Sequence, residues 1–415
     1  MTQRHAPANL YVVRFRRETT FGNNSGGTQH RIHVLEGFSH KATETQLPVK
    51  ELRSRLAQRR KNVHGPRRGT INLPLHLRAH ASQLNAAASV PSVPSPNGAV
   101  LRTALGGWNA GRGSTVQASS TTSTVKVATG HGSRFWVGEA IAVEVSGELE
   151  ICFVTAISTD DLTVYPALTA TPTTSGVVIA SQQYYWSDTS RESASIEVAE
   201  ASAVSGTEDA QYEYLGAHAT GFTLETKIEA DVTFSVALES AGFTGPEALS
   251  QSTADEADTQ SDPFVYMDSQ LWLAPSDTID RTHTTHHTAA FKIDTGMVAI
   301  KDGKGLAKSN RAGVVRTGNP NGTVEFEMPS DFAYLAEYDS KTSYMAVQIH
   351  KIGTGTSARF AVVSCPCLVL DERPDHGEES NRVTTPLKFG MLENDDAVWT
   401  GSDDKSRSPF SIYLL

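Results

Sequence analysis

The densest group of side chains able to do chemistry is a histidine tract, Asp280-Arg-Thr-His283-Thr-Thr-His286-His287. Neutral imidazoles bind zinc, copper or nickel, so one hypothesis is a metal-dependent hydrolase or binding module built on this tract. On a strand, His283 and His287 share a face while His286 points away, so three-point ligation needs a turn. No HExxH sequence accompanies the tract. A solvated polar loop is therefore the favoured interpretation.

A second candidate is Cys365-Pro366-Cys367, which places two thiols on one strand face. This spacing differs from the CxxC of redox and zinc sites, and the only other cysteine is Cys152. The pattern favours buried small side chains, with Pro366 unable to donate a ladder hydrogen bond. Three cysteines also exclude a disulfide framework and favour synthesis inside a cell.

Motifs for nucleotide binding or nucleophilic catalysis do not occur: there is no GxGxxG, GxxxxGK[ST] or GxSxG. Gly303-Lys304-Gly305 and Gly353-Thr-Gly355 are predicted hairpin tips, and Asn321-Gly322 a type I′ turn. Acidic pairs such as Asp160-Asp161 lie in turn contexts, where carboxylates are predicted to cap turns or to remain solvated. We therefore predict no catalytic residue, no cofactor and no metal, and a protein that is not an enzyme.

Charge is distributed unevenly along the 415 residues, although the net charge is only −10. Residues 1–104 carry 16 Lys and Arg against 4 Asp and Glu, a surplus of 12 positive charges. The rest carries 20 against 42, a surplus of 22 negative charges. Such a chain could contact nucleic acid through its basic front, or other copies of itself, basic front to acidic body.

The basic surplus is concentrated in residues 53–68, which hold seven Lys and Arg. Several phosphates could be neutralised there, but the segment lacks interleaved aromatic residues for base stacking. The acidic remainder would also repel DNA. Pairing with an acidic loop of a neighbouring copy is the favoured hypothesis. The predicted contact joins Arg53, Arg55, Arg59, Arg60, Lys61, Arg67 and Arg68 with Asp255, Glu256, Asp258 and Asp262.

Composition indicates a globular β-protein of two or three domains, with 39% hydrophobic and 20% charged residues. No apolar run is long enough for a transmembrane span, and no secretory signal is predicted. Residues 47–62 are the best helix candidate, as a short helix or an irregular basic segment. Residues 31–38 and 69–78 read as strands, and Pro74 places the second at an edge or bulge.

Between Thr115 and about Ala180 the sequence predicts a compact insertion of five short strands separated by explicit turns. Longer strands resume afterwards. The alternation from Leu224 to Leu238 predicts either one bent strand or a hairpin. The remaining predicted strands are 195–200, 212–215, 265–274, 288–293, 297–300, 323–328, 343–351, 359–370 and 381–391, with an apolar tail at 410–415. The fold prediction is all-β, a sandwich or barrel.

The order of four motifs resembles the opening and middle of major tail tube proteins of long-tailed, siphovirus-like bacteriophages. They are Glu18-Thr-Thr-Phe-Gly22, Gly65-Pro-Arg-Arg-Gly69-Thr-Ile-Asn-Leu-Pro-Leu, Ala99-Val-Leu-Arg-Thr-Ala-Leu-Gly106-Gly107 and Tyr214-Leu-Gly-Ala-His-Ala-Thr-Gly-Phe-Thr-Leu-Glu225. The resemblance covers residues 10–110 and 190–350. The insertion after Gly107 departs from it, and the C-terminal 60 residues have no counterpart.

This resemblance implies a tail-tube β-sandwich with a short helix at the ALGG motif. Residues 1–110 and 186–415 would form the tube domain, with a C-terminal extension, and residues 111–185 an inserted small β-barrel on the outer face. Subunits would form hexameric rings that stack into a tube. The other expected partners are the tape measure, tail terminator and distal tail or baseplate proteins. Viral DNA would pass through the lumen without sequence-specific binding, and no membrane is involved.

The expected location is the virion tail, after synthesis and assembly in the cytoplasm of the host bacterium. The segment 53–68 would be the long loop that reaches the adjacent ring. Two alternatives stay open: another virion β-protein, such as a capsid decoration, baseplate or adhesion component, and the histidine-tract metal protein.

Overall fold

The computed structural model describes residues 11–22, 29–47, 63–79, 83–86, 96–187, 192–201, 208–247, 262–266, 269–275, 281–299, 314–316, 320–329, 342–371, 377–379, 382–393 and 403–415. Antiparallel strands dominate this part of the chain, which confirms the all-β prediction. Its helices are α1 (Pro96–Leu105) and the single turn α3 (Asp404–Arg407). Helix α1 ends at Leu105, directly before Gly106 with its φ of +95°, and it includes the region where the resemblance implied a short helix.

Strand β14 (Glu208–Lys227) is shared by two parts of the large sheet. Its first half pairs with β13 (Ala194–Ala201) and β16 (Gly242–Glu247). Its second half pairs with β15 (Thr233–Ser240) and β18 (Thr288–Asp294). The exchange of partners occurs around Gly216, whose φ of +62° favours glycine. A Cβ there would also lie 2.9 Å from the Phe21 ring. This bend positions the two parts relative to each other.

The first part is completed by β1 (Tyr11–Arg17), which pairs with β13 and with β2 (Gln29–Ile32). The second part runs in the order β3 (Ser39–Leu47), β4 (Val63–His76), β15, β14, β18, β21 (Asn321–Pro329) and β25 (Arg382–Met391). Strand β24 (Gly377–Glu379) adds to β25. A separate pair joins β19 (Met297–Ala299) to β20 (Val314–Arg316).

A third part continues from β25 into β23 (Arg359–Leu370), which also pairs with β22 (Tyr344–Ile352) and β26 (Ser411–Leu414). Strand β17 (Ser269–Pro275) lies beside β22. On the other side, β26 pairs with β12 (Gln182–Trp186), which pairs with β5 (Gly106–Ala110). The segments before and after the insertion are therefore neighbours in one sheet.

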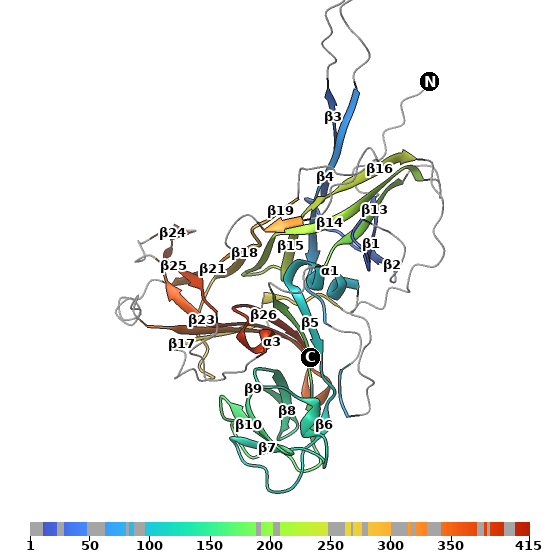
Figure 1. Ribbon diagram of the computed structural model, residues 1–415. Coiled ribbons are helices and arrows are strands. Elements are labelled where there is room, and N and C mark those ends of the chain that lie inside the picture. Colours follow the sequence, from blue (N-terminus) through green and yellow to red (C-terminus); the bar gives the residue numbers. More distant parts are fainter. Residues whose placement is uncertain are drawn as a thin grey trace, which may run out of the picture.

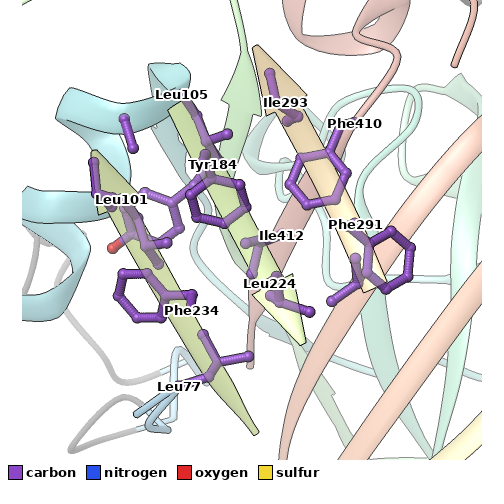
Figure 2. Close-up of a cluster of buried hydrophobic side chains, with 14 of the residues drawn as sticks. Leu77, Leu101, Leu105, Tyr184, Leu224, Phe234, Phe291, Ile293, Phe410 and Ile412 are labelled. Atoms are coloured by element: carbon purple, nitrogen blue, oxygen red, sulfur yellow. The ribbon is translucent and has the colours of Figure 1, made fainter. Parts of the chain in front are cut away.

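The main hydrophobic core lies between the second part of the sheet and the elements that cover it (Figure 2). Leu224, Phe234 and Phe291 come from the sheet, and they face Leu101 and Leu105 of α1 together with side chains of β12 and β26. Period-two alternation places these residues on one face and leaves the polar residues between them on the other. Burying the apolar face fixes the register of the sheet.

The insertion forms a small barrel at the opposite end of the molecule from the β3–β4 hairpin (Figure 1). Its order is β6 (Ser114–Thr115), β11 (Val177–Ile179), β8 (Ala140–Val145), β9 (Glu148–Ser158), β10 (Asp161–Tyr165) and β7 (Thr124–Lys126). A bridge between Val116 and Val127 joins the two edges. The barrel has its own apolar core, and a 3-10 turn, η1 (Gly132–Arg134), precedes β8.

A second apolar cluster attaches the barrel to the third part of the sheet. Phe153 and Ile151 of β9 meet Trp272, Val347 and Tyr413 in this cluster. A hydrogen-bonded polar network lies beside it. The Tyr413 hydroxyl donates to the Gly138 carbonyl at 2.7 Å, and the Gln183 amide donates to Ser411 at 3.1 Å. The barrel is thus packed firmly against the sheet.

Glu139 is fully buried in the same network. Its carboxylate accepts backbone N–H groups from Ser181 at 3.0 Å and Trp136 at 3.3 Å. Burial raises the pKa of Glu139 to about 8, although these hydrogen bonds act in the opposite direction. Burial in the barrel–sheet contact therefore favours the protonated form of this acid.

Several strand predictions need correction. The strand expected at 31–38 ends at Ile32, and 33–38 form a turn. The strand expected at 69–78 begins earlier, at Val63, while Leu47 belongs to β3 instead of a helix. Residues 48–62 of the helix candidate lie outside the described residues. Asn321-Gly322 opens strand β21 opposite Asp294 and is not a turn.

Other predictions are confirmed. The 224–238 run is a hairpin, because the chain turns between β14 and β15 with Glu229 at φ +59°. The ladder between β3 and β4 ends at Asn72, two residues before Pro74. At Pro74, strand β4 therefore pairs with β15 and no longer with β3, as expected for an edge position. Gly353-Thr-Gly355 forms the β22–β23 tip, followed by the 3-10 turn η3 (Gly355–Ser357). Among the described helices, none is long and apolar enough to cross a membrane.

We predict that Glu139 makes stability fall as pH rises. Between pH 4.5 and pH 8 the Glu139 carboxyl loses its proton in the unfolded chain but keeps it in the folded protein. The free energy of unfolding therefore falls by about 1.4 kcal/mol for each unit that the pH rises. Glu139→Gln should remove that slope in urea unfolding measured from pH 5.5 to pH 8. Glu148→Gln, at a more exposed carboxylate, serves as the control. Equal slopes in wild type and Glu139→Gln would contradict the assignment.

Candidate assembly interface

The β3–β4 hairpin projects from one end of the molecule (Figure 1). The two strands pair from Ser39–Asn72 out to Leu47–Val63, with one register shift on the way. Residues 48–62 connect the two paired ends and carry Arg53, Arg55, Arg59, Arg60 and Lys61, all outside the described residues. We call β3, β4 and their connection the arm. In the sequence, the most basic segment of the chain therefore connects the outer ends of this projecting hairpin.

Arg67 and Arg68 lie on β4, within the described part of the arm. Arg67 contacts its own chain: its Nε lies 3.5 Å from a Glu44 carboxylate oxygen, and its guanidinium lies 5.4 Å from the centre of the Phe243 ring. Arg68 is half-buried. Asp262 is exposed beside Pro263, which bridges to Arg78. Asp255, Glu256 and Asp258 lie outside the described residues.

Aromatic side chains gather where the arm leaves the body. His40 lies 5.4 Å from Tyr212 and 5.8 Å from both Tyr11 and Phe38, measured between ring centres. The Nδ1 atom of His40 shares a 2.7 Å hydrogen bond with the Tyr214 hydroxyl. Tyr11 is 40% exposed. The base of the arm is therefore an aromatic surface, which the linear order of these residues did not reveal.

The second part of the sheet has a continuous polar face opposite its buried one. This face is formed by every second residue of six strands, and these residues are mainly Thr, Ser, Glu, Asp and Lys. They are half-exposed or exposed, and they come from β4, β15, β14, β18, β21 and β25. This polar face carries five carboxylates against three lysines, and Lys292 pairs with Glu325 at 3.2 Å. Its charged members are Glu225, Lys227, Glu239, Lys292, Asp294, Glu325, Glu327 and Lys388.

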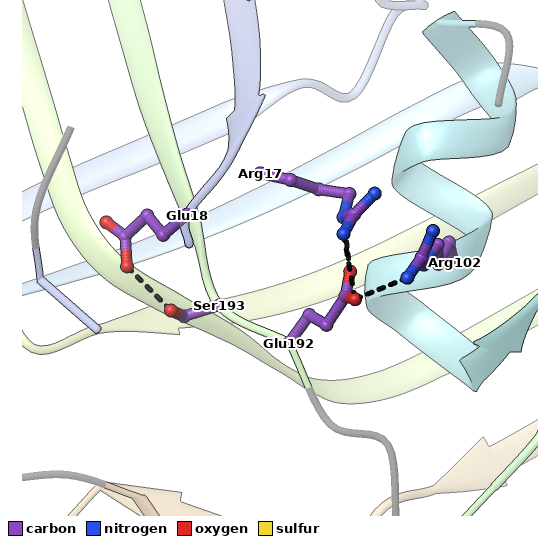
Figure 3. A network of polar contacts seen from close by, with 5 residues as sticks. All are labelled: Arg17, Glu18, Arg102, Glu192 and Ser193. Atoms are coloured by element: carbon purple, nitrogen blue, oxygen red, sulfur yellow. Dashed lines mark hydrogen bonds and ion pairs between the residues drawn. The ribbon is translucent and has the colours of Figure 1, made fainter. Parts of the chain in front are cut away.

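A buried carboxylate connects two of the motifs that carry the tail tube resemblance. Glu18 accepts the backbone N–H of Gly216 at 2.8 Å and that of Gly22 at 2.8 Å. The carboxylate oxygen that accepts the Gly22 N–H, Oε2, also accepts the Ser193 hydroxyl at 2.6 Å (Figure 3). Glu18 therefore ties the end of β1 to the start of β13 and to the bend of β14.

The third motif joins the same region through Glu192, which binds two cations (Figure 3). Arg17 and Arg102 of α1 both pair with its carboxylate, Arg102 at 2.6 Å. Arg102 also lies over the Trp108 ring at 5.2 Å. Three motifs distant in sequence thus meet around two adjacent glutamate sites. The sequence motifs did not predict that these glutamates would bring them together.

The histidine tract does not converge on one point. His283 Nδ1 accepts the Leu271 N–H at 3.2 Å. His286 is buried, and its Nδ1 lies 3.3 Å from the Thr284 carbonyl and its Nε2 3.3 Å from the Gln348 amide nitrogen. In the part of the chain that the structure describes, no three His, Cys, Asp or Glu side chains are arranged to hold a metal. His286 instead packs beside His350 of β22, which sequence reasoning missed.

Cys365 and Cys367 are buried free thiols, as expected for small core side chains. Pro366 lies between the β23 residues that pair with β26 and those that pair with β25. Its missing N–H therefore interrupts no ladder on that side. Burial raises the pKa of Cys365 well above its usual range, so this thiol is unreactive.

Asp160 caps a turn, as predicted for the acidic pairs: its carboxylate accepts the Gly130 and Gly132 N–H groups, each at 3.0 Å. Hydrogen bonding to these two groups lowers the pKa of Asp160.

No protein-family model matches this sequence, and no curated protein matches it.

We predict that Glu18→Ala destabilises the fold by about 3 kcal/mol, because the buried Gly216 N–H and its neighbours lose their acceptor. Chemical denaturation would measure the loss. Glu36→Ala, at an exposed turn glutamate, should change stability by less than about 0.5 kcal/mol. Equal effects of the two substitutions would show that Glu18 does not hold the bend.

We predict that His286 and His350 make the protein acid-labile. Burial lowers the pKa of His286 to about 4 and that of His350 to about 3. As pH falls from 6.5 towards 4, these histidines bind protons in the unfolded chain but stay neutral in the folded protein. Each histidine therefore lowers the free energy of unfolding by about 1.4 kcal/mol per pH unit. His350→Leu should remove the part of this loss of stability that His350 contributes, measured by urea unfolding between pH 4 and pH 6.5. The control His287→Asn should leave the loss unchanged. An unchanged acid slope in His350→Leu would refute the assignment.

Proposed function

We propose that this protein is a structural subunit of a phage tail tube, assembling with copies of itself into stacked, hexameric rings through which the genome is delivered. The observation that carries this proposal is the arm. A paired hairpin projects from a body in which acidic residues predominate, and in the sequence its two outer ends are joined by a basic segment with five cations at residues 53–61. A neighbouring copy, with its acidic surplus, would supply carboxylates to this segment.

A contact between the arm of one copy and the acidic body of another would determine the type of assembly that forms. A contact between two different surfaces of the same chain is head-to-tail, so it closes into a ring or continues as a filament. The arm and the acidic body are such a pair, and the arm would reach the next ring of the stack. Strand β16 pairs only with β14 among the described strands, which leaves an edge for contact within a ring. The aromatic base of the arm supplies apolar area beside it.

The polar face suits the lumen of the tube. It is rich in small hydroxyl side chains and has two more carboxylates than lysines. Such a lining repels phosphates within a Debye length of about 8 Å. DNA would therefore pass without sequence-specific contact. The barrel, attached at the far end from the arm, would stand on the outer surface. The tape measure, tail terminator and distal tail proteins would contact the ends and the lumen.

We predict that reversing Arg59, Arg60 and Lys61 to Glu leaves the monomer folded but abolishes tubes, because the arm would then repel its acidic partner. Negative-stain microscopy and thermal unfolding measure the two effects. The matched control reverses three exposed cations outside the arm tip, Arg31, Lys126 and Lys227, and should keep tubes.

Intact tubes from the arm variant would overturn the proposed contact. Discrete oligomers from the wild-type protein would favour a capsid decoration or baseplate component instead.

A further inference from the structure

The turn between β14 and β15 lies at the opposite end of the second part of the sheet from the arm. Strand β15 begins at Thr233, beside His76 at the end of β4, and finishes at Ser240, beside Gly69. From Gly69 outward, β4 continues into the arm, where among the described strands it pairs only with β3. The arm and the turn are therefore at opposite ends of one ladder.

The turn presents an apolar side chain to the outside. Residues 227–230 are all exposed, and Ile228 at their centre is 42% exposed. Among the large hydrophobic side chains that the structure describes, the exposed ones are Ile228, Tyr11 and Leu392. A single exposed apolar residue is ordinary on a protein surface, so the charges around Ile228 decide which partner fits it.

Four carboxylates surround Ile228. Glu229 is exposed on the turn itself, and Asp231 follows it. Asp262 is exposed on the segment that bridges to Arg78 through Pro263. Glu327 of β21 lies at the same end, two strands from β14 and so about 10 Å away. We call this group the turn surface: Ile228, Glu229, Asp231, Asp262 and Glu327.

The cations described beside the turn surface are fewer than its acids. They are Lys227 and Arg78. Lys227 Nζ already lies 3.2 Å from the Glu225 carboxylate. With Glu225 included, this end of the sheet has five carboxylates against two cations. A basic partner would therefore be attracted to it.

We propose that the arm of one copy binds the turn surface of the next copy in the stack. This inference rests on the proposed function, because a head-to-tail stack brings the end that carries the arm against the opposite end of the next tube domain. The ladder of β4 and β15 identifies that opposite end as the turn surface. The basic arm and the acidic turn surface then match in charge.

The arm also supplies apolar side chains that could cover Ile228. In the sequence, Leu52 and Leu56 lie among the cations of its connection. The aromatic surface at its base exposes Tyr11. Covering an isoleucine in this way favours the contact beyond its charge complementarity.

The polar face fits the arm less well. Its five carboxylates are accompanied by three lysines, and it extends along the strands instead of lying at their end. An arm that continues the direction of β4 would pass such a face of its own copy and meet the strand ends of the next one.

The first test is carbodiimide cross-linking of the full chain, because this reagent joins a lysine directly to a carboxylate that touches it. Unlabelled and ¹⁵N-labelled copies are mixed before the reaction, and cross-linked peptides are identified by mass spectrometry. We expect peptides with one labelled and one unlabelled half that join Lys50 or Lys61 to Glu229, Asp231 or Asp262.

The outcomes separate this contact from the proposed function. Tubes without these mixed cross-links would overturn the contact and leave the tube subunit standing. Mixed cross-links in particles that are not tubes would support the contact and overturn the tube. The absence of both tubes and mixed cross-links would overturn both.

The second test exchanges the charges. Glu229→Lys with Asp262→Lys should abolish tubes, and adding Arg59→Glu, Arg60→Glu and Lys61→Glu should restore them. The control Glu148→Lys with Asp161→Lys changes two carboxylates of the barrel and should keep tubes. Tubes that survive the turn variant, or that the arm reversal does not restore, would overturn the pairing. Circular dichroism shows that each variant is folded.

The third test removes the apolar contact. Ile228→Ser should raise the concentration needed for tubes about tenfold, as expected when a partly covered isoleucine is lost from a contact. Leu392→Ser changes another exposed large hydrophobic residue and should leave that concentration unchanged. Equal effects of the two substitutions would remove Ile228 from the contact.

Discussion

The bend in β14 is the constraint on which the rest of the structure depends. Strand β14 serves two parts of the sheet, and where its partners change Gly216 adopts a positive φ that favours glycine. The turn leaves a buried N–H without a strand partner, and Glu18 accepts it. Because Phe21 occupies the space that a side chain would need, the turn and the first motif of the chain are matched to each other.

Much of the fold was predictable from alternation, because a sheet with one buried face imposes period two. Strands β18 and β21 were predicted for that reason, and their alternate apolar residues lie in the core: Ala289, Phe291, Ile293, Val324, Phe326 and Met328. The run from Leu224 to Leu238 could not distinguish a bent strand from a hairpin, since both keep the same alternation. Asn321-Gly322 was misassigned because turn chemistry is local, whereas the ladder opposite Asp294 is a long-range contact.

The candidate sites were less predictable, because they join residues far apart in the chain. His286 was visible as part of a tract, but its contact with Gln348 and its proximity to His350 depend on packing against β22. The basic segment was visible as charge, yet only the pairing of β3 with β4 shows that it continues from a projecting hairpin. The polar face required the strand order, which no single segment contains.

These features form a consistent division of the molecule. The arm and its aromatic base occupy one end, the polar face spans the middle, and the barrel occupies the other end. Attachment of the barrel through a buried cluster holds it in one orientation on the sheet. In the proposed stack of rings, such a barrel would repeat at regular positions on the outer surface.

A tube subunit must polymerise, so the most direct measurement is electron microscopy of the purified wild-type protein over a range of concentrations. We expect hollow filaments of uniform diameter, with an axial repeat of stacked rings in their averaged images. A protein that stays monomeric, or forms only discrete particles at every concentration, would contradict the central claim.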